Sequence, residues 1–367
     1  MTDPVTDVRP PPARKGHWGI FLPLLAFLLL AAVYTVYWFI VAGEVRKGVE
    51  AFAARGDGDL AVSWDTFAVG GYPYRIEAGF ISPTASEPDA PEAWAWRGEA
   101  AEFALLPYNL RHVIVNLRGV QTLSYRDVTA ATPVRNEARA TASAAWGSYV
   151  DVDGAPFGRL AIDIEELEAS HHRGAANIDE ALSAKRLQVH TRPAENETAG
   201  AIPDSYDMAI QADGLVLTGA QEIPVLGPAA ERISAQARLR GLPRTPHVSL
   251  VELLREWQAT GGTLSVSDLI VKWGPLDLSA QGDLRLDAQH RPEGQLNAKV
   301  SDFEGLLDAM VRDGFVEERE ARVALAGLVL VSQFQGNRTD EVRVPVIMQG
   351  GLLYLGPLAI AKLEPLY

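Results

Sequence analysis

The residues best suited to chemistry are gathered in the segment EELEASHH, from Glu165 to His172. Its three carboxylates and two imidazoles are donor types that bind divalent transition metals and that act as general acids or bases. The segment follows an alternating run through Ile162 and Ile164, which predicts a strand, and adjacent side chains of a strand leave on opposite faces. We therefore expect a solvated strand end, with no metal site formed by His171 and His172.

The chain lacks the motifs by which common enzyme classes are recognised. It contains no G-x-x-x-x-G-K-[ST] loop, no helix-opening G-x-G-x-x-G, no H-E-x-x-H and no G-x-S-x-G. DVDG, at residues 151–154, supplies the start of a calcium loop without the remaining ligands. Cysteine is absent, which excludes disulfides, a thiolate nucleophile and Cys-ligated metals. We expect a protein that is not an enzyme and that holds no cofactor.

Charge and length narrow the classes further. A formal net charge of -14, with no basic stripe along the chain, argues against a nucleic-acid partner, because phosphates require a clustered basic surface. A chain of 367 residues is long enough to bury a sizeable core and to form one large or two ordinary domains.

A long uncharged segment, WGIFLPLLAFLLLAAVYTVYWFIVAG, occupies residues 18–43. As a helix it measures about 39 Å, more than the ~30 Å hydrocarbon core of a bilayer. Arg14 and Lys15 precede it, so the positive-inside rule predicts a cytoplasmic N-terminus. A cleaved signal peptide is the alternative, because residues 41–43 are small, but the apolar run exceeds the usual ~7–15 residues of such peptides. We expect an uncleaved single-pass anchor in the inner (cytoplasmic) membrane.

The predicted anchor is one of four parts of the chain. Residues 1–17 are predicted to form a disordered cytoplasmic tail, and residues 44–59 a helical stalk that ends at Gly56 and Gly58. Residues 60–367 are predicted to form a periplasmic β-rich domain, with two possible halves at about 60–245 and 246–367. The lipid bilayer is therefore the first expected partner, contacted through the anchor.

The β-rich assignment rests on alternation. In LDLSAQGDLRLDA, residues 276–288, every even position is small or apolar and every odd position is polar, which predicts a long strand with one apolar face. Similar runs recur after residue 60, and the run at 263–273 changes phase between Val266 and Leu269, which indicates a β-bulge. The pattern predicts a large, curved, mostly antiparallel sheet shaped as a trough or incomplete barrel.

Helical spacing interrupts this pattern in two places. SLVELLREWQA, residues 249–259, opens with a capping box of Ser249 and Glu252 and places Trp257 on its apolar face. DFEGLLDAMVRDG, residues 302–314, has the same spacing and is followed by a further helical run from Glu317 to about Ser332. The fold class is therefore mainly β with flanking helices.

Two long tracts carry a family resemblance. GGTLSVSDLIVKWGPLDLSAQGDLRLDAQHRPEGQLNAKVSDFEGLLDAM with VRVPVIMQGGLLYLGPLAIAKLEPL, and YWFIVAGEVRKGVEAFAARG followed by VGGYPYRIEAGF, resemble membrane-anchored envelope proteins of the domain of unknown function 2125. The strand ends also resemble envelope proteins related to AsmA, whose curved sheets are thought to form lipid-binding grooves. The resemblance implies a fold and an apolar ligand class, and it identifies no catalytic residue.

Two functions follow from these expectations, and an enzyme with an unrecognised site is a third alternative. In the first, the apolar sheet face binds or passes lipid through the envelope, and small residues leave a furrow for it. The expected groove residues are Leu278, Ala280, Gly282, Leu284, Ala298 and Trp257. In the alternative, the helices close the sheet and the protein is a scaffold or adaptor for envelope protein partners. A turn motif consists of Gly71, Tyr72, Pro73 and Tyr74. Its two tyrosines, with Trp94 and Trp96, are interpreted either as a ligand mouth or as a structural turn with ordinary core packing.

Overall fold

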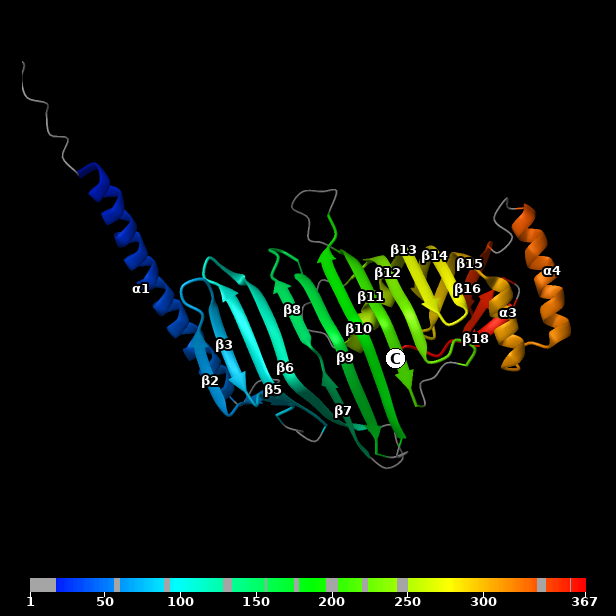
Figure 1. The fold of residues 1–367 in the computed structure, drawn as a ribbon, viewed down its shortest axis with the longest axis horizontal. Helices are drawn as coiled ribbons and strands as arrows, with labels where there is room; N and C mark the ends of the chain where they lie inside the picture. The colour runs from blue at the N-terminus through cyan, green and yellow to red at the C-terminus, as the bar shows by residue number, and fades with distance from the viewer. Residues whose placement is uncertain are drawn as a thin grey trace, which may run out of the picture.

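The computed structural model contains one large open sheet, with one helix at one end, two helices at the other, and a short helix behind its middle strands (Figure 1). It describes residues 18–55, 60–88, 93–127, 134–155, 157–174, 178–195, 204–219, 224–242, 250–334, 341–356 and 358–367. The expected fold class is confirmed: the chain is mostly β, the sheet is antiparallel, and it does not close into a barrel. The predicted tail at 1–17 and the 245/246 division lie outside the described residues.

The first helix, α1 (Trp18–Ala54), runs without interruption from the apolar segment into the predicted stalk. It is the one described helix long and apolar enough to cross a membrane, a property shared by anchors and signal sequences. The end of the predicted anchor already packs on the sheet, because Trp38 and Ala42 are buried against Ile76, and Val45 of the predicted stalk packs beside them. Removal of these apolar side chains from water stabilises the contact, so α1 and the first strands of the sheet pack as one unit.

The strands form a meander in which most strands pair with their neighbours in sequence. At three positions in the sheet, two short strands take the place of one long strand. β1 pairs with β4 and β2 pairs with β3, and β3 and β4 both pair with β5. β7 and β8 together fill the position between β6 and β9. The strands are β1 Ala61–Ser63, β2 Thr66–Gly70, β3 Ile76–Ile81, β4 Thr84–Ser86, β5 Trp94–Leu106, β6 Asn109–Asp127, β7 Val134–Thr141, β8 Ala144–Val150, β9 Arg159–Arg173, β10 Ile178–Pro193, β11 Ser205–Thr218, β12 Ala229–Arg240, β13 Thr263–Trp273, β14 Leu276–Leu286, β15 Pro292–Ser301, β16 Glu341–Gln349, β17 Leu352–Leu355 and β18 Leu358–Lys362.

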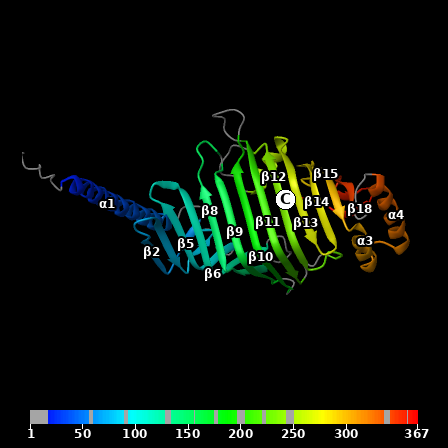
Figure 2. The ribbon, with the colours of Figure 1, turned by 45° about the horizontal axis from the view of Figure 1, so that its top comes forward.

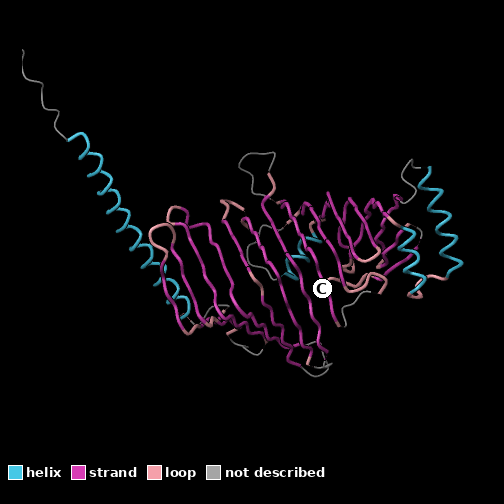
Figure 3. Tube along the Cα trace, viewed as in Figure 1, coloured by secondary structure: helices cyan, strands magenta, loops and turns pink. Residues whose placement is uncertain are grey.

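Irregular residues cross the sheet in a line, here called the bulge row. Ser82, Glu166 and Gly214 have positive φ angles of 51°, 49° and 59°. Next to Gly214, the β12 register shifts between Ala230 and Arg232. Bulges bend strands and increase their twist. Figure 3 shows the long strands turning near their lower ends, so the sheet is curved along its length.

The far end of the sheet is covered by two helices, α3 (Phe303–Arg312) and α4 (Glu318–Phe334). Phe303 and Leu306 are buried with Val300 and Val342, and residues of α4 pack on the same cluster. Asp302 caps α3 by accepting from the Gly305 amide at 3.2 Å. The helices expected near 303–313 and 317–332 are therefore confirmed.

The remaining helix, α2 (Leu250–Ala259), connects β12 with β13. It is confirmed as a helix, while its predicted cap at Ser249 lies outside the described residues. Figure 2 gives a second view of the same order, with α1 at one end of the sheet and α3 and α4 at the other.

The packing of α3 predicts a difference between two leucines. Leu306 is 9% exposed and Leu330, on α4, is 56% exposed. Leu306→Ala removes buried methyl groups and should lower the free energy of unfolding by about 2–5 kcal/mol. Leu330→Ala should change it by no more than about 0.5 kcal/mol. Denaturant midpoints of the two purified variants measure the difference, and equal midpoints would show that α3 does not stabilise the sheet.

Candidate functional site: an apolar sheet face

Strand register places apolar side chains on one face of the sheet. Leu278 lies opposite Val271 on β13 and Val300 on β15, and Ala280 lies opposite Leu269 and Ala298. The register shift between Val266 and Leu269 confirms the predicted bulge and keeps both residues on this face. The predicted residues Leu278, Ala280, Gly282, Leu284 and Ala298 therefore share one face, as alternation required.

The same face continues through the middle of the sheet. One part of the face is buried there, since Leu217, Ala230 and Trp273 form a hydrophobic cluster. At the level of Ile210 the side chains are half-buried or exposed, and Ile210 on β11 is 42% exposed. The helices at the two ends pack on the outer strands, α1 on β1–β3 and α3 and α4 on β15 and β16. We call this middle region the open apolar face. Its residues are Leu160, Ile162, Ile164, Leu187, Val189, Met208, Ile210, Ala235 and Ala237.

The predicted groove residues lie beyond this region, where the face is filled. Ala280 and Ala298 are buried with Leu296 and Val346, and Leu278 and Leu284 are partly buried against that cluster. Their small side chains are covered by protein atoms, because β17 contributes Leu353 and Leu355 to the same cluster. A furrow for a ligand was expected here, and the structure instead shows a packed hydrophobic core.

Position 282 requires glycine for a reason other than a ligand furrow. A Cβ atom at this position would lie 2.2 Å from the Gln295 carbonyl oxygen and 2.9 Å from Leu296 Cα, and φ is +156°. The neighbouring strand β15 therefore approaches too closely for any side chain. The interpretation of Gly282 as part of a ligand furrow is replaced by a close approach of two backbones beside the β13 bulge.

Trp257 does not join the groove residues. Its indole nitrogen donates to the Arg240 carbonyl at 2.7 Å, and its ring is buried outside the four hydrophobic clusters of the described chain. The next residue, Gln258, contacts His290 at 2.8 Å and the Tyr367 hydroxyl at 3.3 Å. The C-terminal end of α2 is thus fixed to the strand ends and to the chain terminus.

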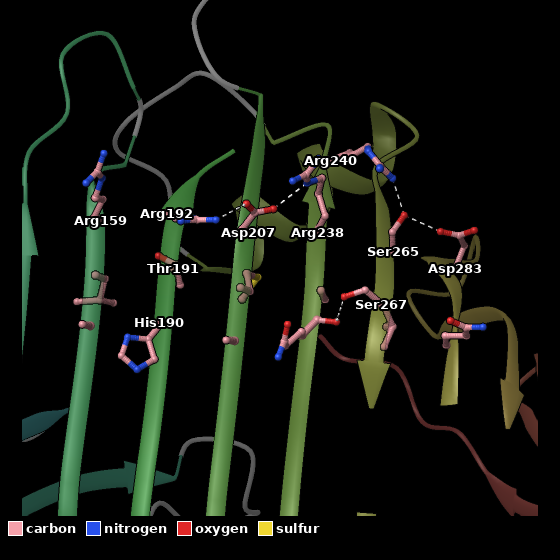
Figure 4. A pocket seen from close by; sticks show the side chains of 18 of the residues that line it. Arg159, His190, Thr191, Arg192, Asp207, Arg238, Arg240, Ser265, Ser267 and Asp283 are labelled. Atoms are coloured by element: carbon pink, nitrogen blue, oxygen red, sulfur yellow. Dashed lines mark hydrogen bonds and ion pairs between the residues drawn. The ribbon is translucent and has the colours of Figure 1, made fainter. Parts of the chain in front are cut away.

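The opposite face of the sheet is polar and carries ion pairs across strands. Asp207 on β11 accepts from Arg238 on β12 at 2.7 Å and from Arg192 on β10 at 3.4 Å (Figure 4). An open cavity of about 970 Å³ lies among these groups, lined mostly by polar-face side chains. Most of its charged groups are engaged with one another, since Arg240 also donates to Ser265, which bonds to Asp283. The cavity is therefore lined by ion pairs and hydrogen bonds that join neighbouring strands.

These pairs shift carboxyl pKa values. The Arg238 hydrogen bond lowers the pKa of Asp207, and the Arg186 hydrogen bond lowers that of Asp163. The pKa of Asp213 is lowered by hydrogen bonds from Gln211 and then Arg232. Because each folded pKa lies below its ordinary value of 3.8, the stabilisation is present above that pH. It is lost as the pH falls through the lowered values.

The two histidines of the segment 165–172 lie on opposite faces of the sheet, as expected. His171 is on the apolar face, where it bonds to the Tyr125 hydroxyl at 2.9 Å and the buried Glu180 at 3.2 Å. His172 is exposed and pairs with Asp179 at 2.8 Å. No group of three or more metal-ligating side chains occurs in the part of the chain that is described.

Sequence reasoning missed the polar group around Glu180. Arg173 also pairs with Glu180 at 3.2 Å, so one buried carboxylate receives an imidazole and a guanidinium. This group lies at the edge of the apolar face, at the ends of β9 and β10. The residues next to Glu180 in the sequence gave no signal of its burial, because its partners come from β9.

The predicted turn motif is structural and touches α1. The Tyr72 hydroxyl and the Thr35 hydroxyl are 2.7 Å apart, and the Pro73 carbonyl accepts from the Tyr34 hydroxyl. Gly71 has φ +94°, and a Cβ there would lie 2.6 Å from the Arg75 carbonyl oxygen, so the turn requires glycine. Tyr74, at the tip, is exposed.

The fold and face together define an open, single-sheet antiparallel protein with an N-terminal apolar helix. A family model described as an uncharacterized protein conserved in bacteria (DUF2125) matches residues 38–364, and the chain belongs to this family. The match begins at Trp38, where α1 meets the sheet, and includes every strand. No curated protein and no solved structure matches the chain, so the comparisons do not show the resemblance to AsmA.

Gly282 provides a test of the close approach. Gly282→Ala should lower the free energy of unfolding by about 1–3 kcal/mol, because its Cβ would displace the β15 backbone. Gly79→Ala, in β3, is the matched control, since no atom lies within 4 Å of a Cβ there. Thermal melting of both variants decides the point, and a Gly282→Ala protein as stable as the parent would restore the furrow interpretation.

The opposite placements of His171 and His172 also predict different costs. His171→Ala removes one partner of the buried Glu180 and should destabilise the protein by about 1–3 kcal/mol. His172→Ala removes an exposed pair, worth about 0–1 kcal/mol at most. Urea unfolding at neutral pH measures both. Equal stabilities of the two variants would contradict the burial of the His171 pair.

Proposed function

We propose that the protein binds or passes lipid, or another apolar ligand, along the open apolar face, and thereby serves maintenance of the cell envelope. One observation carries the proposal: a single apolar face runs from α1 to α3 and α4, and the side chains of its open apolar face are half-buried or exposed. Large contiguous apolar surfaces of soluble domains mark sites for ligands, membranes or partners.

The chemistry of the two faces favours an acyl chain. Burial of each methylene contributes about 0.8 kcal/mol, so a chain laid over several strands would bind usefully without enclosure. The polar face offers no comparable surface among the described residues, because its arginines and aspartates pair across strands. The proposal requires no catalytic step, no metal and no cofactor.

The proposed location follows from α1. We propose a single-pass anchor in the inner membrane, with the N-terminus in the cytoplasm and the sheet in the periplasm. The length and composition of the helix support a span, and Arg14 and Lys15 before it support this orientation.

A matched pair of substitutions on β11 tests the ligand proposal. Ile210 lies on the open apolar face and is 42% exposed, whereas Val216 lies on the polar face and is 38% exposed. Ile210→Glu should remove most co-purified lipid, because a carboxylate would have to lose its hydration beside the acyl chain. Val216→Glu should leave lipid unchanged, and both variants should keep the melting temperature of the parent.

Native mass spectrometry of the detergent-released protein measures the bound lipid. Lipid retained by Ile210→Glu, or a parent protein that carries no lipid when purified from native membranes, would contradict the proposal.

A second candidate function, an adaptor for envelope proteins, is favoured by the outer surface of α4. Val323, Leu330 and Phe334 are exposed there at helical spacing. If the adaptor function is correct, Leu330→Asp should abolish the cellular phenotype of the protein while Ile210→Glu leaves it intact. The opposite result favours the ligand function.

A further inference from the structure

The part of α1 that precedes its first bond to the sheet is shorter than the hydrocarbon core of a bilayer is thick. Among the described residues, the first α1 side chain that bonds to the sheet is that of Tyr34. The segment ahead of it, residues 18–33, is about 24 Å long at ~1.5 Å per residue. The hydrocarbon core of a bilayer is about 30 Å thick. A helix that enters the membrane at Trp18 therefore reaches its far side near Tyr37 or Trp38.

Two turns of the sheet are fixed at this level of the helix. The Tyr37 hydroxyl donates to the Pro107 carbonyl at 2.9 Å, in the β5–β6 turn. The Trp38 indole donates to the Arg75 carbonyl at 3.1 Å, beside the β2–β3 turn that also accepts from Tyr34. These bonds leave no spacer between the helix and the sheet. The turns must therefore lie at the depth of residues 34–38.

The tips of both turns carry exposed aromatic rings. Tyr74 in the β2–β3 turn and Tyr108 in the β5–β6 turn are each 82% exposed. Tyrosine is enriched at membrane interfaces, where the ring contacts apolar chains and the hydroxyl remains hydrated. Half-exposed arginine side chains, Arg75 and Arg111, stand next to the two turns and pair with Glu77 and Asp153.

We propose that these turns form a second membrane contact, in which Tyr74 and Tyr108 insert into the interfacial layer of the leaflet that faces the sheet. This contact rests on the proposed membrane span of α1. It sets the orientation of the domain, because two turns and one helix fix the sheet against the bilayer surface. It also brings the start of the apolar face, at Ile76 and Leu105, to the edge of the hydrocarbon.

Spin labels test this contact directly, because the chain contains no cysteine. Single variants Tyr74→Cys and Tyr108→Cys are labelled with a nitroxide in the full chain, which is then reconstituted into phosphatidylethanolamine and phosphatidylglycerol vesicles. Leu28→Cys reports the span. Phe334→Cys is the matched control, since this aromatic ring is 90% exposed at the opposite end of the molecule.

The measurement is the ratio of relaxation by oxygen, which concentrates in lipid, to relaxation by a nickel chelate, which stays in water. We expect the ratio at positions 74 and 108 to be at least threefold higher than at 334 and lower than at 28. Ratios at 74 and 108 equal to that at 334, with a high ratio at 28, would overturn the second contact and leave the anchor intact. A low ratio at 28 would overturn both.

Discussion

The structure depends on one constraint: hydrogen-bond register must hold apolar side chains on the same face from strand to strand. A shift of one residue in any strand would move its apolar set to the polar face. The bulge row shows how strictly the constraint applies. At the level of Glu166 and Gly214, β9, β10 and β11 change phase together, so Ile164 and Leu167 stay on one face, and Leu187 and Ala184 opposite them do the same.

The constraint gives the two faces different energetic roles. On the polar face, pairs such as Arg186 with Asp163 join neighbouring strands, but exposed pairs of this kind each contribute only about 0–1 kcal/mol. They oppose slippage of register more than they add stability, because a shift would place like charges or apolar groups opposite them. Burial on the apolar face contributes more to the free energy of folding, and it occurs both where α1, α3 and α4 pack and in two clusters formed by strands.

Local patterns in the sequence were sufficient for the features that depend on neighbouring residues. The apolar face of β14, the bulge after Val266, and the helices α2, α3 and α4 follow from periodicity, and α1 follows from an uncharged run; both are properties of a short segment. The role of Gly282 was not predictable in this way, since the clash that requires glycine comes from Gln295 on another strand. The contact of His171 with Glu180 and the packing of Trp38 on Ile76 likewise depend on pairings between separate elements.

The same reasoning explains why the predicted groove residues are packed although the apolar face itself was predicted. Small residues such as Ala280 and Ala298 leave space only if nothing else fills it, and here β16 and β17 bring Val346 and Leu355 onto the cluster. Larger residues such as Ile210 remain exposed because no described helix packs on β11. Availability to a ligand is therefore set by what covers a residue, and not by its size. On the proposed function, an acyl chain would lie beside Ile210 and Val189, between a membrane-side end sealed by α1 and a far end filled by α3 and α4.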